Sequence, residues 1–119
     1  GIALRTPLRL DILPDRNTLY REVEGGLIEN VYTLKIMNMD QDPHTYTLSA
    51  DGLPGITIST RSDRIAVKPG EVRTVPATIR VDPEDVRGTG HDITLTISAT
   101  DDPGIRVVEE TRFHTPLQR

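Results

Sequence analysis

The chain has 119 residues, a formal net charge of −4 and no cysteine. These values fit one domain of ordinary size and exclude disulfides, thiolate metal sites, catalytic cysteines and cysteine-bound iron–sulfur clusters from this chain. The basic residues form no block and there are only three Tyr, one Phe and no Trp, so the basic stripe and stacking aromatics typical of nucleic-acid binding are both missing.

The first half of the chain alternates apolar and polar residues with period two, which is typical of half-buried β-strands. The longest such run begins at Ile28 and ends at Ile36. The residues on the apolar faces of these runs are Leu8, Leu10, Ile12, Ile28, Asn30, Tyr32, Leu34, Ile36, Tyr46, Leu48, Ile56 and Ile58. Residues 13–27 give the weakest pattern and predict either a short strand around residues 19–23 or a long loop.

The second half continues the same alternation. Its apolar faces consist of Ile65, Val67, Val75, Ala77, Ile79, Val81, Ile93, Leu95, Ile97 and Ala99, and a final strand opens at Ile105 and Val107 and runs towards Phe113. Turn residues separate the runs, with Pro and Gly at residues 51–55, 68–71, 82–85 and 101–104. Pro76 lies inside a strand run, which predicts an edge position or a bulge there.

This spacing of short strands predicts an all-β fold, an immunoglobulin-like antiparallel sandwich of about seven to eight strands. We expect a single domain over residues 1–119, with Tyr32, Leu34, Ile36, Val75, Ile79, Ile93, Leu95 and Ile97 in its core. The inter-sheet disulfide and Trp of antibody domains are absent, so the chain groups with the cysteine-free, fibronectin-like or bacterial sandwiches. Because it starts at Gly1 without a Met, we expect it to be a segment of a longer protein.

Catalytic chemistry is not indicated by the sequence. His44, His91 and His114 could each act as a base, but no nucleophile motif such as Gly-x-Ser-x-Gly accompanies them. The acidic pairs at residues 84–85, 101–102 and 109–110 read as solvated charge in or beside turns, or on a terminal strand. The turn at residues 101–104 could hold Ca²⁺, but one short acidic turn supplies too few converging oxygens. We therefore expect no enzymatic activity and no catalytic residue in this domain.

A metal site is a separate hypothesis. Met37 and Met39 are two residues apart in a strand, which places both on one face, and His44 follows after a short turn. Thioether and imidazole ligands suit copper, so Met37, Met39 and His44 are the candidate ligands. The alternative is that both methionines are adaptable packing residues.

Two asparagines mark the ends of the longest strand run. Asn30 falls on its inward face, and Asn38 stands at its other end. A buried amide must be hydrogen bonded, so we expect Asn30 to bond the backbone of a neighbouring loop and to serve folding and not ligand binding.

The chain resembles the C-terminal domain of the FixG/CcoG cytochrome oxidase accessory proteins over residues 5–116. The resemblance is carried by residues 5–11, the Asp-Arg-Asn block at 15–22, the Ile-Glu-Asn-x-Tyr-x-Leu-x-Ile-x-Asn block at 28–38, residues 51–56, the turn at 69–71, and residues 101–105 leading to Phe113 and Pro116. The two blocks are fairly specific, whereas the turns alone are not.

The resemblance implies a parent protein with transmembrane helices and cysteine-bound 4Fe–4S clusters, in which an Ig-like domain follows the last helix and faces the periplasm. The family assists assembly of cbb-type cytochrome c oxidase, with a role in copper reduction and delivery. This chain carries no cofactor of its own in that scheme, because the cluster cysteines have no counterpart here. Its expected partner is a protein in oxidase assembly and not a nucleic acid.

Two other functions remain open from the sequence. The domain could bind copper directly through the residues named above. It could also be a stand-alone sandwich that binds carbohydrate or an adhesion partner, although four aromatics leave few for a stacking platform.

Overall fold

The computed structural model describes residues 6–15 and 19–117. That part of the chain forms strands joined by short loops and two 3₁₀ helices. The elements are β1 (Leu8–Pro14), β2 (Arg21–Glu22), η1 (Glu24–Gly26), β3 (Ile28–Asn38), β4 (His44–Asp51), β5 (Thr57–Thr60), β6 (Ile65–Val67), β7 (Val72–Val81), η2 (Pro83–Asp85), β8 (Gly90–Ala99) and β9 (Arg106–His114). The all-β prediction is confirmed.

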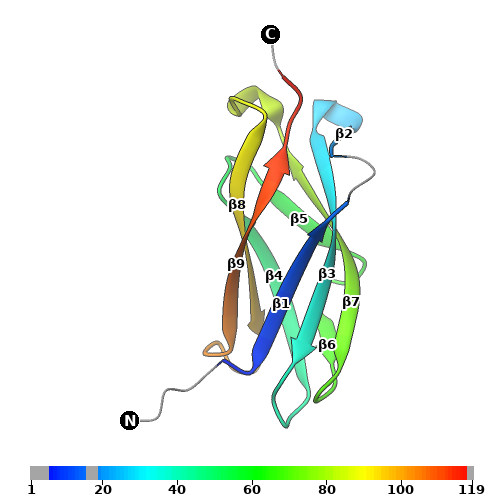
Figure 1. Ribbon diagram of the computed structural model, residues 1–119, viewed down its shortest axis with the longest axis vertical. Helices are drawn as coiled ribbons and strands as arrows, with labels where there is room; N and C mark the ends of the chain where they lie inside the picture. Colours follow the sequence, from blue (N-terminus) through cyan, green and yellow to red (C-terminus); the bar gives the residue numbers. More distant parts are fainter. Residues whose placement is uncertain (1–5, 16–18, 118–119) are drawn as a thin grey trace.

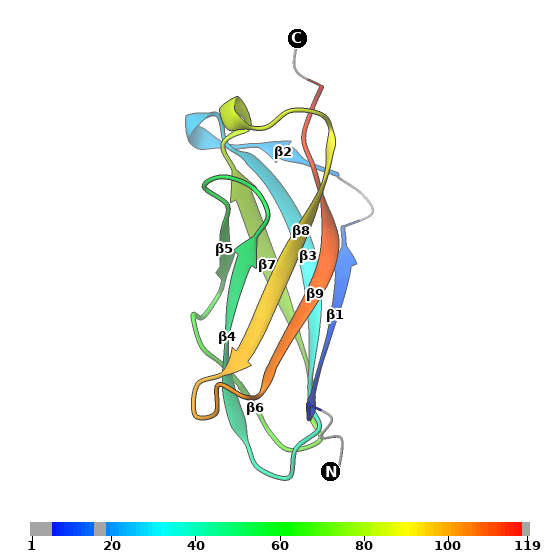
Figure 2. The same ribbon diagram turned by 90° about the vertical axis from the view of Figure 1, so that its left-hand side faces the viewer.

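The strands form two antiparallel sheets that pack face to face (Figure 1). The first sheet has the order β1-β3-β7-β5, and β2 pairs with the start of β3. The second has the order β6-β4-β8-β9. The view in Figure 2 separates the two layers, with β4, β8 and β9 in front of β3 and β7. This is the immunoglobulin-like sandwich expected from the alternation.

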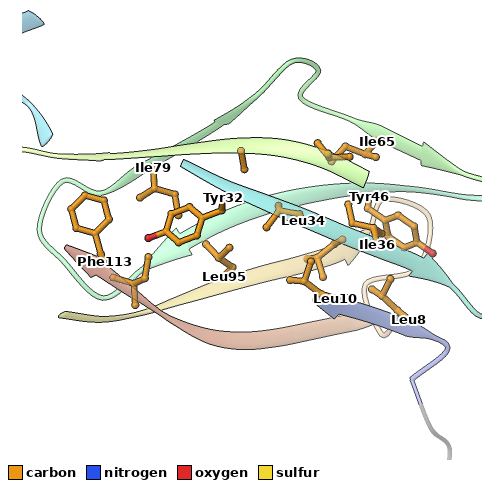
Figure 3. Packing of buried hydrophobic residues seen from close by; sticks show 14 of the residues in the cluster. Leu8, Leu10, Tyr32, Leu34, Ile36, Tyr46, Ile65, Ile79, Leu95 and Phe113 are labelled. Carbon is orange, nitrogen blue, oxygen red and sulfur yellow. The ribbon is translucent and has the colours of Figure 1, made fainter. Parts of the chain in front are cut away.

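The core lies between the inner faces of the sheets, where the apolar rows of β3, β7 and β8 interdigitate. All eight residues predicted for the core are buried, and Leu34, Ile36, Ile79, Leu95 and Ile97 have no exposed surface at all. Figure 3 shows Tyr32 and Phe113 at one end of this core and Tyr46 and Leu8 at the other. The period-two rows therefore predicted the packed face correctly.

The sandwich is elongated, with a longest extent of 53 Å. We call one end the lower end, because it lies at the bottom of Figure 1; it carries the loops at residues 39–43, 68–71 and 100–105. The opposite, upper end carries the start of β3, the end of β9 and the loop between β7 and β8. The strand β1 leaves the lower end and β9 reaches the upper one.

Two local predictions need refinement. Between residues 19 and 27 the chain forms only the two-residue strand β2 and the turn η1, so the short strand exists but is smaller than the pattern suggested. Pro76 does not lie on an edge strand, because β7 runs between β3 and β5. The β5 register ends at Ala77, however, so Pro76 has a strand partner only in Thr33 of β3. The missing Pro N–H is tolerated because β7 is locally an edge at that point.

Candidate functional site

The lower end is held together by the side chain of Asn38, the last residue of β3. Asn38 has no exposed surface. Its Nδ2 donates to the carbonyls of Asp42 (2.9 Å) and Val67 (3.0 Å), and its Oδ1 accepts the N–H of Asp40 at 2.9 Å. Its own carbonyl accepts the N–H of Gly70 at 2.7 Å. One buried amide thus fixes the turns that follow β3 and β6, and a satisfied network of this kind favours one loop geometry.

His44 opens β4 and lies between two carboxylates. Its Nε2 is 2.7 Å from Oδ2 of Asp40, and its Nδ1 is 3.0 Å from Oδ1 of Asp101. The ring is almost fully buried, with 5% of the side chain exposed. Each nitrogen must carry a proton to donate to its own carboxylate, so this geometry stabilises the imidazolium.

We call His44, Asp40 and Asp101 the triad. The pKa shifts of its three members follow from the same two hydrogen bonds. The bond to Asp40, followed by the bond to Asp101, raises the pKa of His44 above its ordinary value, against the opposing effect of burial. In return, the hydrogen bond from His44 lowers the pKa of Asp40 and the pKa of Asp101. Since Asp101 belongs to the turn between β8 and β9, the triad ties that turn to the turn between β3 and β4.

Tyr46 lies next to this triad, two residues further along β4. Its ring centroid is 6.0 Å from that of His44, and its side chain is fully buried. Burial, helped by the charges of Asp40 and Asp101, raises the pKa of Tyr46 to about 12, so the phenol keeps its proton. Its hydroxyl finds no hydrogen-bond partner in the part of the chain that the structure describes.

A groove opens beside the triad on the side of the sandwich where β6 and the start of β7 face each other. Its volume is about 460 Å³, and its lining residues are Pro43, His44, Thr45, Ala66, Val67, Lys68, Glu71 and Arg73. A second hollow of about 280 Å³ adjoins it along β7, lined by Arg61, Ser62, Ile65, Arg73, Thr74, Val75 and Pro76. Arg73 lines both hollows, and we call the two together the β6–β7 groove.

Arg73 occupies an unusual place in the strand pattern. It continues the inward row of Val75, Ala77 and Ile79 on β7, yet it is exposed at the open side of the sandwich. Its Nη1 donates to the carbonyl of Ala66 on β6 at 2.7 Å, so one guanidinium links the two sheets.

The structure places the three candidate metal ligands in different surroundings. Met37 lies between the inward-facing Ile36 and Asn38 and therefore points to the outer face of the first sheet. Met39 follows the end of β3 and is 57% exposed. His44 is buried with both ring nitrogens hydrogen bonded. Among the described residues, no group of three or more His, Asp or Glu side chains is arranged to hold a metal ion. The copper site remains a prediction from sequence.

The other residues singled out in the sequence have structural partners. Asn30 is buried and bonds backbone as expected, although its partner is His114 at the end of β9 and not a loop. Nε2 of His91 contacts Oγ1 of Thr115 at 3.0 Å. Asp102 accepts the N–H of Gly104 within its own turn, at 3.0 Å. These contacts use the polar groups for folding.

Sequence reasoning did not single out Asp40 or Arg73, and it interpreted Asp101 as solvated charge in a turn that is a weak candidate for Ca²⁺. Asp40 could have been found, because it stands four residues before His44 across a short Pro-containing turn. Asp101 is 57 residues away from His44, so only the sheet order brings it close. From the sequence, Arg73 looks like an ordinary surface cation, because the residues around it do not indicate that β6 lies opposite.

Comparison with known proteins gives a consistent result. Residues 1–116 match the family described as "IG-like fold at C-terminal of FixG, putative oxidoreductase". The nitrogen fixation protein FixG of Rhizobium meliloti is 31% identical over 86 residues, which are 72% of this chain but 15% of that protein's length. The crystal structure of a FixG-related protein from Vibrio parahaemolyticus has a TM-score of 0.80 and 29% identity, over 93% of this chain and 98% of that one. Across the described residues, no helix is long and apolar enough to cross a membrane.

Proposed function

Since this chain belongs to the family of Ig-like domains at the C-terminus of FixG, we propose that it is a non-catalytic docking module of a longer, membrane-bound oxidoreductase. The parent protein would carry the 4Fe–4S clusters elsewhere and assist assembly of cbb-type cytochrome c oxidase through copper reduction and delivery. The domain would face the periplasm and bind a protein partner in that process. The match to FixG spans only 15% of that protein, and since this chain has no cysteine to hold a cluster, the proposal assigns the redox chemistry to parts outside it.

The observation that carries the docking role is the β6–β7 groove. Its walls are fixed by the hydrogen bonds of Asn38 and the triad of His44, so a partner would meet a preformed surface. The same bonds argue against catalysis by His44, because neither ring nitrogen is free to take a proton from a substrate.

Deleting the domain from the parent protein tests this proposal. We expect loss of assembled cbb-type oxidase in the membrane, while the truncated parent still inserts and keeps its iron–sulfur absorbance. Normal oxidase assembly would contradict the docking role, and so would loss of the clusters, which would indicate a structural role for the domain. A parent in which an unrelated Ig-like domain replaces this one is the control for simple spacing and should also fail.

The location can be tested because this chain has no cysteine. Val108 is exposed on the outer face of β9, so a Val108→Cys variant of the parent adds one reporter thiol in this domain, and labelling is compared with the unmodified parent, which carries only its cluster cysteines. We expect a membrane-impermeant maleimide to label it in intact spheroplasts; labelling only after lysis would contradict a periplasmic domain.

A further inference from the structure

Three cationic side chains line the β6–β7 groove: Arg61, Lys68 and Arg73. All three are exposed. Within residues 6–15 and 19–117, no carboxylate forms an ion pair with any of them. Their charge is therefore available to an anionic ligand, on a chain whose net charge is −4.

One acidic residue shares this surface. Glu71 lines the groove, and its carboxylate accepts the backbone N–H of Lys68 at 2.7 Å while keeping its negative charge. Asp63 lies in the loop between Arg61 and Arg64, but it lines a different hollow, with Thr47 and Ile58. The lining of the groove therefore carries the three cations against one carboxylate, which leaves it net positive.

The shape of the groove suits an extended chain. Its two hollows, of about 460 and 280 Å³, follow one another along β7 and meet at Arg73. Apolar residues lie between the cations: Val67 and Pro43 in the larger hollow, and Ile65 and Pro76 in the smaller. An occupant would therefore need several anionic groups in a line, with apolar groups between them.

We propose that the β6–β7 groove binds an acidic, extended polypeptide segment of the partner protein, an inference that rests on the docking function. Carboxylates of the segment pair with Arg61, Lys68 and Arg73, and apolar side chains between them contact the groove floor. Arg73 is the central residue because it reaches both hollows and, being anchored on the Ala66 carbonyl, is already held in place.

Two alternatives fit the geometry less well. Strand addition to β6 is disfavoured because β6 has only three residues and Arg73 already occupies the Ala66 carbonyl. An anionic bilayer surface is disfavoured because Arg73 and Lys68 line a concave groove, which a flat surface does not enter.

Binding to this 119-residue domain can be measured directly, because its own core packs both sheets and the solved relative consists almost entirely of the same domain. The probe is a fluorescein-labelled peptide of about eight residues, about 27 Å when extended, rich in Glu with Val and Pro between. We expect saturable binding by anisotropy that weakens with added salt. A Gln-for-Glu version of the peptide should not bind.

Charge reversal identifies the surface. The double variant Arg61→Glu/Lys68→Glu should bind the acidic peptide about tenfold or more weakly, because two attractive contacts are lost and the reversed charges repel the peptide. Arg73→Ala should also weaken binding. The matched control is Arg106→Glu on β9, at the far edge of the second sheet, which should bind as the wild type does.

Three outcomes would overturn the inference: equal binding of the Gln peptide, equal loss in Arg106→Glu, or charge-dependent binding to vesicles containing phosphatidylglycerol with none to the peptide. If peptide binding fails while deletion of the domain still abolishes oxidase assembly, docking stands and this groove is not its surface. If deletion has no effect on assembly, the docking function itself fails whatever the peptide does.

Discussion

The side-chain amide of Asn30 bonds the main chain of His114 in both directions. Its Nδ2 donates to the His114 carbonyl at 2.9 Å, and its Oδ1 accepts the His114 N–H at 2.8 Å. Asn30 belongs to β3 in the first sheet and His114 to β9 in the second. The pair therefore joins the two sheets at the upper end as a strand neighbour would.

Replacing Asn30 by Ala removes both bonds and leaves the part-buried N–H and carbonyl of His114 without this partner. We expect a loss of about 1–3 kcal/mol in the free energy of unfolding, measured by urea denaturation. Ser59→Ala, on an exposed position of β5, is the control and should stay within about 0.5 kcal/mol of wild type. An Asn30→Ala variant as stable as this control would show that the pair contributes nothing.

Two buried tyrosines make a matched test of the hydroxyl group. Tyr32 donates to the Arg112 carbonyl at 2.7 Å, while the Tyr46 hydroxyl has no partner among the described residues. Tyr32→Phe should lower the free energy of unfolding by about 1 kcal/mol, because it leaves the carbonyl unpaired. Tyr46→Phe should be neutral or stabilising, because it removes an unsatisfied buried polar atom. Equal losses in both variants would reveal a hidden partner for Tyr46.

The triad of His44, Asp40 and Asp101 should make stability depend on pH at both ends of the range. The pKa of His44 is raised on folding, so its contribution is fully present below the unfolded value of 6.5 and is lost as pH rises through the folded pKa. The pKa of each Asp is lowered from 3.8, so their contribution is present above that value and is lost as pH falls through the folded pKa. The gain in stability is therefore greatest between the unfolded pKa of the two Asp residues and that of His44.

The comparison that isolates the triad is wild type against His44→Gln across that whole range. We expect the difference in unfolding free energy to be greatest between about pH 5 and 6.5 and to shrink towards acid and towards alkali. Tyr46, the other titratable group packed against the ring, keeps its proton throughout, since burial raises its pKa to about 12. A difference that does not vary with pH would mean that the imidazolium is not the stabilising form.

Titration with Cu(I) tests whether Met37, Met39 and His44 form a copper site. Because His44 is held by two carboxylates and Met37 points to the outer face, we expect anaerobic Cu(I) titration against a competing chelator to give the same affinity for wild type and for Met37→Leu/Met39→Leu. Clearly tighter binding by wild type would confirm the site predicted from sequence and would require His44 to leave its carboxylates.

The packed face of this fold was readable from sequence because it depends on a local rule. Leu34, Ile79 and Leu95 each belong to a row with strict period two, and all three are buried. The site, by contrast, depends on which strands are neighbours in the sheets. His44 gave a local signal, but its contact with Asp101 arises only because β4 and β8 are neighbours in the second sheet, and no local pattern reveals strand order.

The role of Arg73 could not be predicted either, because it is a charged residue at an inward position of its strand. The row on β7 places Arg73 with Val75 and Ala77, where a charged residue would normally end the pattern. It is accommodated because the open side of the sandwich lets its guanidinium reach solvent and the Ala66 carbonyl together. The weak pattern before Ile28 left a short strand and a long loop both open, since the two residues of β2 are too few to show a period.

If the domain is tethered through the chain before it, as the proposed function implies, the placement of β1 has a mechanical consequence. β1 leaves the lower end and pairs with β3 over seven consecutive residues along the long axis, while β9 exits at the upper end. A pull between the two ends acts along the strands, and antiparallel hydrogen bonds lie across them. The load is then shared by the whole β1–β3 ladder in shear, and the bonds do not open one at a time as in a zipper.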